Sequence, residues 1–311
     1  MKLARAIDRL LRMLAPLPLP LLHGIGSLLG TLALLFPNDA RHTARVNVEI
    51  CFPQWTARRK RGLVRCSLRE TAKMMVELSA VWYRSPERVR KLIREVRGAE
   101  YLDDAVARGK GVLIAAPHLG SWELLQAWVA TRTPLHALYR PPRQAELESL
   151  MVRARSRTGA HFHPARGSGV RSLMRALNQG EGVGILPDQQ PPEEGVYAPF
   201  FGVPAKTMTL FCRFAARSDA TPLITWAERL SWGRGYRIHI RPLPPECGDP
   251  DPERAAAAMN GAIEEAAMTT PCQYQWTYRR FSRQPQGRHN PYKRYRTRGM
   301  WVEARGLRTE D

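Results

Sequence analysis

Short apolar runs that alternate with helical patterns are the feature that most constrains the fold of this chain. The clearest is GVLIAAP (residues 111–117), which has no charged residue and is followed by the helical pattern SWELLQAWVATR (residues 121–132). A run that is apolar at every position predicts a strand buried on both faces. Further strands are expected in PLHALYRP (134–141), GVGILPDQ (182–189), PLITWAERL (222–230) and GYRIHIRPL (235–243).

Helical patterns precede these strands and lie between them. SPERVRKLIREV (residues 85–96) is expected to be one helix, because Ser85 is a candidate N-cap, Pro86 suits the first helical position and Glu87 lies in the first turn. The last two strands suggest a hairpin around SWGRG (residues 231–235). The alternation of strand and helix predicts an α/β fold with a mixed central sheet and flanking helices.

The first 36 residues predict a segment that associates with membranes. Residues 1–15 place leucines and an isoleucine at helical spacing opposite basic residues, the pattern of an amphipathic helix on an anionic membrane. Residues 14–36 contain no Lys, Arg, Asp or Glu. The prolines at the start of this stretch leave about 16 residues without proline or charge, which suits a segment that dips into the bilayer better than one that spans it. A buried core helix remains the alternative, and the absence of a nearby small-x-small site argues against a signal peptide.

Charge and cysteine content limit the partners and the compartment. The 48 Lys and Arg against 28 Asp and Glu give a net charge of +20, which favours nucleic acid, acidic lipid or an acidic protein as partner. The five cysteines are odd in number and form no C-x-x-C pair, which argues against a disulfide framework and a structural zinc site. A reducing compartment is the simplest interpretation.

A histidine and a glutamate follow the apolar run in HLGSWE (residues 118–123). His118 comes at a strand end, where α/β sheets place their active sites. Five positions rotate a helix by about 500°, so His118 and Glu123 meet only if His118 lies in the loop and Glu123 in the first helical turn. Glu123 would then fix the imidazole tautomer. Since no nucleophile, P-loop or zinc-protease motif is present, a substrate hydroxyl is expected to attack directly.

Seven segments in order resemble the bacterial late acyltransferases of lipid A biosynthesis, the lauroyl and myristoyl transferases, a family that also includes phosphatidylinositol mannoside acyltransferases. The resemblance covers about residues 40–285. The segments are NVEICFP (47–53), GKGVLIAAPHLGSWE (109–123), LYRP (138–141), RSRTG (155–159), GILPDQQ (184–190), PFFGVPAKT (199–207) and PCQYQWTYRRF (271–281).

The resemblance implies an acyltransferase in which His118 is the general base and Glu123 its orienting partner. The acyl donor would be a thioester on acyl carrier protein, the acceptor a hydroxyl of a lipid A precursor, and no metal or further cofactor would be needed. Arg155 would bind acceptor phosphate or support His118 and Glu123, and Asp188 matches an active-site position. Family members often carry a charged residue or histidine after the Pro-Asp, whereas this chain has QQPPEE (residues 189–194).

Four further residues are candidates for substrate binding. Tyr139 and Arg140 belong to the LYRP segment, and Phe200 and Phe201 could line an acyl pocket or belong to an ordinary core. QYQWTYRRF (residues 273–281) mixes aromatic and basic residues, which suits a single-stranded nucleic-acid platform or a membrane interface. No nucleic-acid-binding module is recognisable, so no nucleic-acid partner is expected.

The expected organisation is a membrane anchor (residues 1–36), a catalytic acyltransferase-like domain (37–284) and a basic tail (285–311). The enzyme would lie on the cytoplasmic face of a bacterial inner membrane, bound to anionic lipids. The alternative keeps the acyl transfer and changes the acceptor to an aminolipid, glycerophospholipid or glycolipid.

Overall fold

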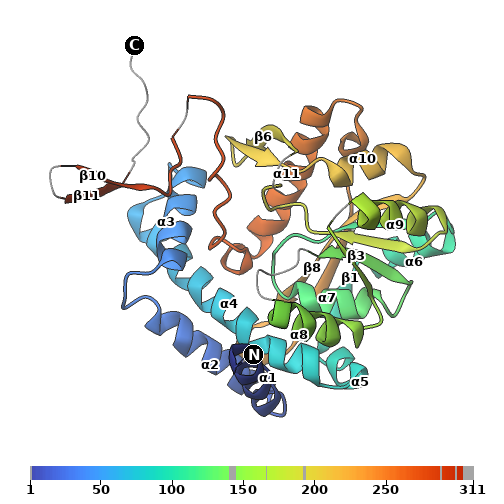
Figure 1. Ribbon diagram of the computed structural model, residues 1–311, viewed down its shortest axis with the longest axis horizontal. Coiled ribbons are helices and arrows are strands. Elements are labelled where there is room, and N and C mark those ends of the chain that lie inside the picture. Colours follow the sequence, from blue (N-terminus) through green and yellow to red (C-terminus); the bar gives the residue numbers. More distant parts are fainter. Residues whose placement is uncertain are drawn as a thin grey trace.

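A central seven-stranded sheet organises the chain in the computed structural model, which describes residues 2–139, 145–165, 167–191, 194–287, 289–297 and 300–303 (Figure 1). The strand order is β1-β9-β8-β2-β5-β3-β4. All neighbouring pairs are parallel except β8 and β9, which form an antiparallel hairpin. The predicted mixed α/β sheet is therefore confirmed. The strands are β1 (Ile93–Arg97), β2 (Val112–Ala115), β3 (Leu135–Tyr139), β4 (His161–Pro164), β5 (Gly182–Ile185), β8 (Thr221–Arg229) and β9 (Tyr236–Pro242).

Strand β2 lies near the middle of the sheet and is buried on both faces, as its apolar run predicts. Leu113 and Ala115 enter one core, and Val112 and Ile114 enter the other, because successive strand side chains point to opposite faces. Helices cover each face of the sheet. The first core includes α9 (Gly167–Asn178), α10 (Leu210–Arg217) and α11 (Pro252–Thr269), and the second includes α6 (Ala99–Ala107) and α7 (Trp122–Val129).

One predicted helix is wrong in its second half. Helix α5 (Pro86–Arg90) begins at the expected cap, where Ser85 accepts a hydrogen bond from the backbone N–H of Arg88. Residues 93–97, however, form strand β1 at the edge of the sheet, parallel to β9. An edge strand tolerates charged residues on its exposed side, so the pairing partner β9 overrides the local helical pattern.

The N-terminal third of the chain is helical: α1 (Lys2–Leu14), α2 (Leu19–Leu32), α3 (Asp39–Cys51) and α4 (Ala57–Tyr83). Helix α2 packs closely along α4 through two glycines. A Cβ on Gly26 would lie 2.5 Å from the Cα of Lys73, and one on Gly30 would lie 2.5 Å from the Cα of Arg69. Small residues four positions apart permit such a close approach of two helices. None of the helices in the described ranges has the length and apolarity needed to cross a bilayer.

The remaining described elements are short, and one of them carries a disulfide. Cys66 of α4 is bridged to Cys272 of η3 (Pro271–Gln273), while Cys51, Cys212 and Cys247 are free and buried. The cysteine pattern argued against a disulfide framework, and this bridge departs from that expectation. The two cysteines are 206 residues apart, so their spacing in the sequence does not indicate the pairing. The other elements are α8 (Ala145–Ser156), β6 (Val196–Phe200), β7 (Val203–Thr207), η1 (Ser231–Gly233), η2 (Pro245–Gly248), β10 (Arg294–Thr297) and β11 (Met300–Glu303).

Candidate active site

His118 lies in the loop between β2 and α7 and forms a close pair with Asp188. The ring Nδ1 of His118 is 2.8 Å from Oδ1 of Asp188, and the backbone N–H of His118 donates to Oδ2 at 2.9 Å. Asp188 follows β5, which is the parallel neighbour of β2, so the carboxyl ends of these two strands place both residues at one edge of the sheet. The side chain of Asp188 is 3% exposed and that of His118 is 13% exposed.

The surroundings of this pair define the hydrogen-bonding state of the imidazole. Burial raises the pKa of Asp188, but the charge and hydrogen bonds of His118 lower it more, so the pKa lies below its ordinary value. The ionised carboxylate accepts from Nδ1, so Nε2 is the ring nitrogen whose lone pair can accept a hydrogen bond. Gln189 donates to this Nε2 at 3.1 Å and also to Oε1 of Gln275 at 3.1 Å.

Glu123 has other partners than His118. The guanidinium Nε of Arg155 in α8 lies 3.1 and 3.2 Å from the two carboxylate oxygens of Glu123, and a second Arg155 nitrogen donates to the same group. The indole N–H of Trp82 in α4 donates to Oε2 at 3.1 Å. The expected hydrogen bond from His118 to Glu123 is therefore replaced by one to Asp188. Glu123 lies in the first turn of α7 as predicted, but it is bound by groups from α4 and α8.

The loop that carries His118 is fixed by backbone hydrogen bonds on both sides. The carbonyl of His118 accepts from the N–H of Gln275 at 3.0 Å, and the N–H of Ser121 donates to the carbonyl of Ala227 in β8 at 2.8 Å. Gly120 has a φ of +64°, and a Cβ there would lie 1.9 Å from the carbonyl oxygen of Ala227. Only glycine fits this close approach at a left-handed backbone angle. Gly120, Gln189 and Gln275 lie in segments that carry the family resemblance, but no local pattern indicates these contacts.

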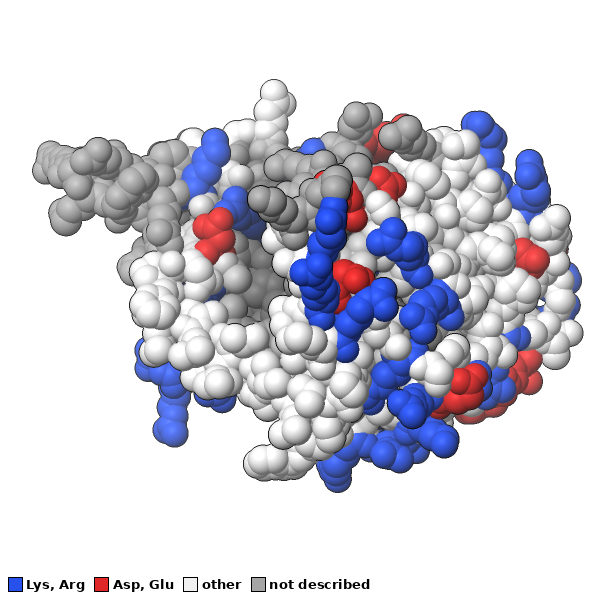
Figure 2. All heavy atoms as spheres, turned by 60° about the horizontal axis from the view of Figure 1, so that its bottom comes forward, with Lys and Arg blue, Asp and Glu red and all other residues white. Residues whose placement is uncertain are grey.

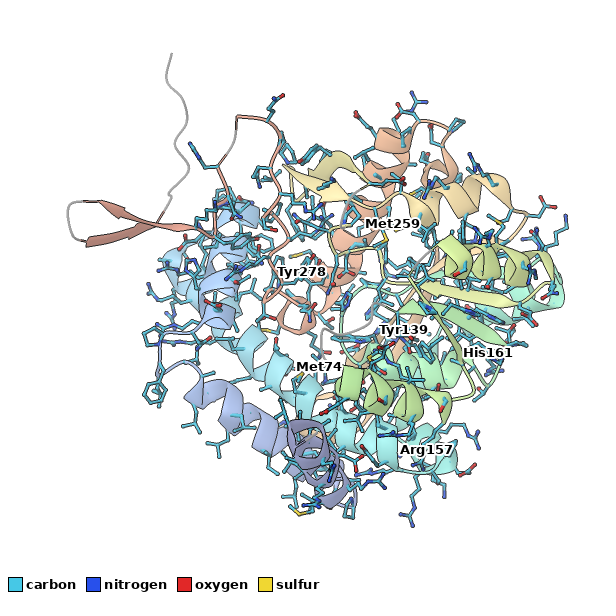
Figure 3. The ribbon with its side chains drawn as sticks, viewed as in Figure 1. Met74, Tyr139, Arg157, His161, Met259 and Tyr278 are labelled. Atoms are coloured by element: carbon cyan, nitrogen blue, oxygen red, sulfur yellow. A yellow bond between two sulfur atoms is a disulfide. The ribbon has the colours of Figure 1, made fainter. Side chains whose placement is uncertain are left out.

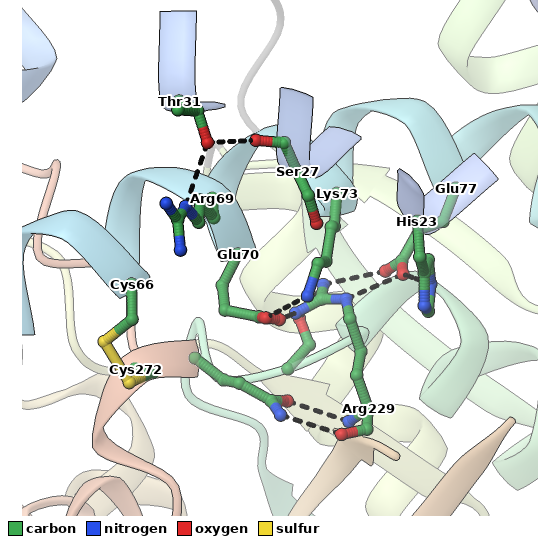
Figure 4. A network of polar contacts seen from close by, with 12 residues as sticks. His23, Ser27, Thr31, Cys66, Arg69, Glu70, Lys73, Glu77, Arg229 and Cys272 are labelled. Atoms are coloured by element: carbon green, nitrogen blue, oxygen red, sulfur yellow. Dashed lines mark hydrogen bonds and ion pairs between the residues drawn. A yellow bond between two sulfur atoms is a disulfide. The ribbon is translucent and has the colours of Figure 1, made fainter. Parts of the chain in front are cut away.

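A buried ion-pair network contacts the same loop through Arg229, and Figure 4 shows Arg229 with Glu77 and His23. Arg229 of β8 donates to the carbonyl of Gly120 at 2.8 Å and binds the carboxylate of Glu77 in α4 at 2.7 and 2.8 Å. The hydroxyl of Tyr236 donates to Glu77, and His23 of α2 lies 3.3 Å from it. Burial raises the pKa of Glu77, but Arg229 and His23 lower it by more than burial raises it, and the resulting pKa is about 2. One signal was present in the sequence, since Glu77 is the acid inside the apolar stretch MMVELSAVW (residues 74–82).

The candidate substrate-binding residues lie at different depths. Tyr139 ends β3, and its hydroxyl donates to Glu148 of α8 at 2.9 Å; Figure 3 labels it with Met74 and Tyr278 around the middle of the view. Arg140 lies outside the described residues.

The two phenylalanines pack among aromatic side chains. Phe200 is 1% exposed and borders a cavity of about 10 Å³ beside Asp188, and Phe201 contacts Phe52 and Trp276. A cavity of that size has room for about one water molecule, and Phe200 packs beside it as part of the first hydrophobic core.

The geometry can therefore support proton abstraction by a histidine. A neutral imidazole whose Nδ1–H is held by a buried carboxylate presents Nε2 to a hydroxyl. In the described ranges, His, Cys, Asp and Glu form no group of three or more that could hold a metal ion.

Comparisons with known proteins identify the family. The family described as bacterial lipid A biosynthesis acyltransferase matches residues 6–283. The chain is 32% identical to the lipid A biosynthesis palmitoleoyltransferase of Escherichia coli (strain K12), over 89% of this chain and 90% of that one. It is 30% identical to the lipid A biosynthesis lauroyltransferase of the same organism, over 87% and 88%. It is 23% identical to the myristoyltransferase, over 88% and 84%. With this coverage, the chain belongs to the bacterial lipid A biosynthesis acyltransferases and is an acyltransferase.

Proposed function

We propose that the protein transfers a fatty acyl chain from acyl carrier protein to a hydroxyl of a lipid A precursor, with His118 as general base. The observation that supports this mechanism most directly is the 2.8 Å contact between Nδ1 of His118 and Asp188. Asp188 holds the tautomer in which Nε2 is the hydrogen-bond acceptor, and the substrate hydroxyl would replace the Gln189 amide at this nitrogen. In this proposal Asp188 takes the orienting role that the sequence assigned to Glu123.

The reaction steps follow from one proton moving through Nε2 of His118. The acceptor hydroxyl gives its proton to Nε2 while its oxygen forms a bond to the thioester carbonyl carbon. The tetrahedral intermediate then breaks its carbon–sulfur bond, and the imidazolium returns the proton to the leaving sulfur. The products are an oxygen ester on the lipid and a free thiol on the carrier.

Glu123 and Arg155 act together in this proposal. The bidentate contact fixes the guanidinium, and the indole of Trp82 holds the carboxylate from the other side. Arg155 would thereby present a fixed positive charge near the site for acceptor phosphate or for the developing oxyanion. Glu123 is then a positioning residue for Arg155.

The membrane assignment rests on the surface of the first two helices. Leu3, Leu10 and Met13 of α1 are exposed, as are the basic residues Arg5 and Arg9. This arrangement suits a helix that lies on an anionic surface. We propose that residues 1–36 form the membrane anchor, residues 37–284 the catalytic domain and residues 285–311 a basic tail, on the cytoplasmic face of the bacterial inner membrane. The net charge of +20 would favour both anionic lipids and an acidic carrier protein.

The test is acyl transfer by purified protein in detergent, from labelled acyl carrier protein to a lipid A precursor. Wild type should form product, and His118→Ala should form none while its folding and membrane association are retained. His161→Ala is a matched control, because His161 is an exposed histidine on β4. Full activity of His118→Ala would overturn the mechanism. Absence of product with folded wild type would reject the lipid A precursor or the carrier thioester, and aminolipid, glycerophospholipid and glycolipid acceptors would be tried next.

A further inference from the structure

The most exposed large apolar side chain of the described residues lies outside the N-terminal helices. Trp232, at the tip of the β8–β9 hairpin, is 89% exposed. Its backbone has a φ of +61°, a left-handed conformation that costs a residue other than glycine roughly 1 kcal/mol or more. A large aromatic ring held in water by a strained backbone indicates a partner that covers it.

The hairpin tip is fixed against the start of helix α2. A Cβ on Gly233 would lie 2.5 Å from the Cα of Pro20, so the two backbones are in direct contact. Helix α2 exposes Leu21, Leu28 and Leu32, which are spaced by seven and four residues and share one helix face. Trp232 therefore lies beside the beginning of an apolar stripe that runs along α2.

Two exposed arginines lie close to Trp232. Arg234 is in the same hairpin loop, and Nε of Arg94 donates to its carbonyl at 3.0 Å. Figure 2 views the molecule from the side of α1 and α2, and its blue Lys and Arg side chains gather beside an uncharged white area. A Trp with two arginines in or against its loop and a leucine stripe alongside matches the composition of membrane-interface segments.

We infer that the β8–β9 hairpin is a second membrane contact, in which Trp232 inserts into the interface of an anionic bilayer next to helix α2. The inference rests on the proposed membrane-bound function and extends it beyond residues 1–36. Because β8 also carries Arg229 and Ala227, which bind the His118 loop, the contact would set the orientation of the active site relative to the lipid surface. A contact that adds the hairpin beside α2 restricts the orientation more than a single amphipathic helix does.

The experiment measures partition of the full chain into phosphatidylglycerol–phosphatidylcholine vesicles. Trp232→Gly is the informative variant, because glycine accepts the left-handed backbone and the fold should keep or gain thermal stability. Its partition coefficient should fall by about tenfold, as expected when part of a Trp ring leaves the interface. Tyr101→Ala, which removes an exposed aromatic from α6, is the control and should partition like wild type.

A second readout locates the ring directly. With brominated phospholipids, wild-type fluorescence should be quenched on binding, and Trp232→Phe should lose much of the quenched component. Unchanged partition of Trp232→Gly and unchanged quenching of Trp232→Phe would overturn the inference. A raised KM for acyl carrier protein with unchanged partition would instead assign the hairpin to the carrier. Vesicle binding needs no turnover, so a lack of acyl transfer would refute the proposed function without deciding this test.

Discussion

Nδ1 of His118 lies 2.8 Å from Oδ1 of Asp188, while the backbone N–H of the same histidine donates to Oδ2 at 2.9 Å. One buried carboxylate thus fixes both the ring and the loop that carries it. Asp188 follows the strand next to the one that precedes His118, so the pair depends on the order of strands in the sheet.

Replacing this carboxylate should remove most of the activity. In Asp188→Asn the amide cannot accept from both the ring Nδ1–H and the backbone N–H, so the imidazole loses its fixed tautomer. We expect the rate of acyl transfer to fall about 10²–10⁴-fold. Asp104→Asn, at an exposed position of α6, is the control. Activity of Asp188→Asn near that of the control would exclude Asp188 as the orienting group.

Glu123 and Arg155 should behave as one unit in a double-mutant cycle. Glu123→Gln leaves the Arg155 guanidinium without this carboxylate, and Arg155→Gln leaves Trp82 as the remaining hydrogen-bond partner of Glu123 among the described residues. We expect each single variant to lower kcat/KM, and the double variant to be little worse than the more damaged single variant. The coupling should be on the order of 1–3 kcal/mol. Losses that multiply would show that the two residues act independently.

Alanine substitutions at Gly120 and Gly109 should distinguish the cost of a steric contact from the cost of backbone strain. Both have left-handed angles, with φ of +64° and +66°, but a Cβ on Gly109 meets nothing within 4 Å. Gly109→Ala should therefore cost only the strain of about 1–2 kcal/mol. Gly120→Ala should cost about 1–3 kcal/mol more, because its Cβ meets the carbonyl of Ala227. Chemical denaturation measures both, and equal losses would argue against the tight contact.

A similar pair tests the packing of α2 on α4. Gly24→Ala places its methyl group in open space and should stabilise the helix by about 0.5–1 kcal/mol. Gly26→Ala should destabilise by about 1–3 kcal/mol, because its methyl group meets the backbone of Lys73. The midpoints of thermal unfolding report the difference. Stabilisation by both variants would mean that the two helices are further apart than described.

The Glu77–Arg229 pair should make stability depend on acid pH. The pKa of Glu77 falls from 4.5 to about 2 on folding. A lowered folded-state pKa contributes stability that is fully present above about pH 4.5 and is lost as the pH falls to about 2. The full effect corresponds to roughly 3 kcal/mol.

Glu77→Gln removes that titration and tests the assignment. The variant should be less stable by about 3–5 kcal/mol at neutral pH, because it leaves Arg229 buried without its charge partner. Its free energy of unfolding should also vary less between pH 5 and pH 2 than that of wild type. Urea unfolding across this pH range measures both effects. Parallel pH profiles for the two proteins would contradict the lowered pKa.

Local patterns were sufficient for the parts of the fold that are specified by neighbouring residues. The apolar run before His118 predicted β2, and the expected strands around residues 135–139, 182–185, 221–229 and 236–242 all form. Periodicity reports these elements because burial on one or both faces selects side chains at fixed spacing. The ordered motifs also indicated the acyltransferase family, because each motif can be recognised in the sequence without knowing its tertiary contacts.

Only the tertiary structure decided which side chains meet. Glu123 is five residues from His118 and binds Arg155, whereas Asp188 is 70 residues away and binds the imidazole. The same holds for Cys66 with Cys272, and for Glu77 with Arg229. Strand order, register and helix packing set these pairs, and the free energy of each contact depends on burial that no single segment contains. The sequence by itself therefore determined the central strands and the family, whereas the packing of distant segments decided the edge strand β1 and the partners at the site.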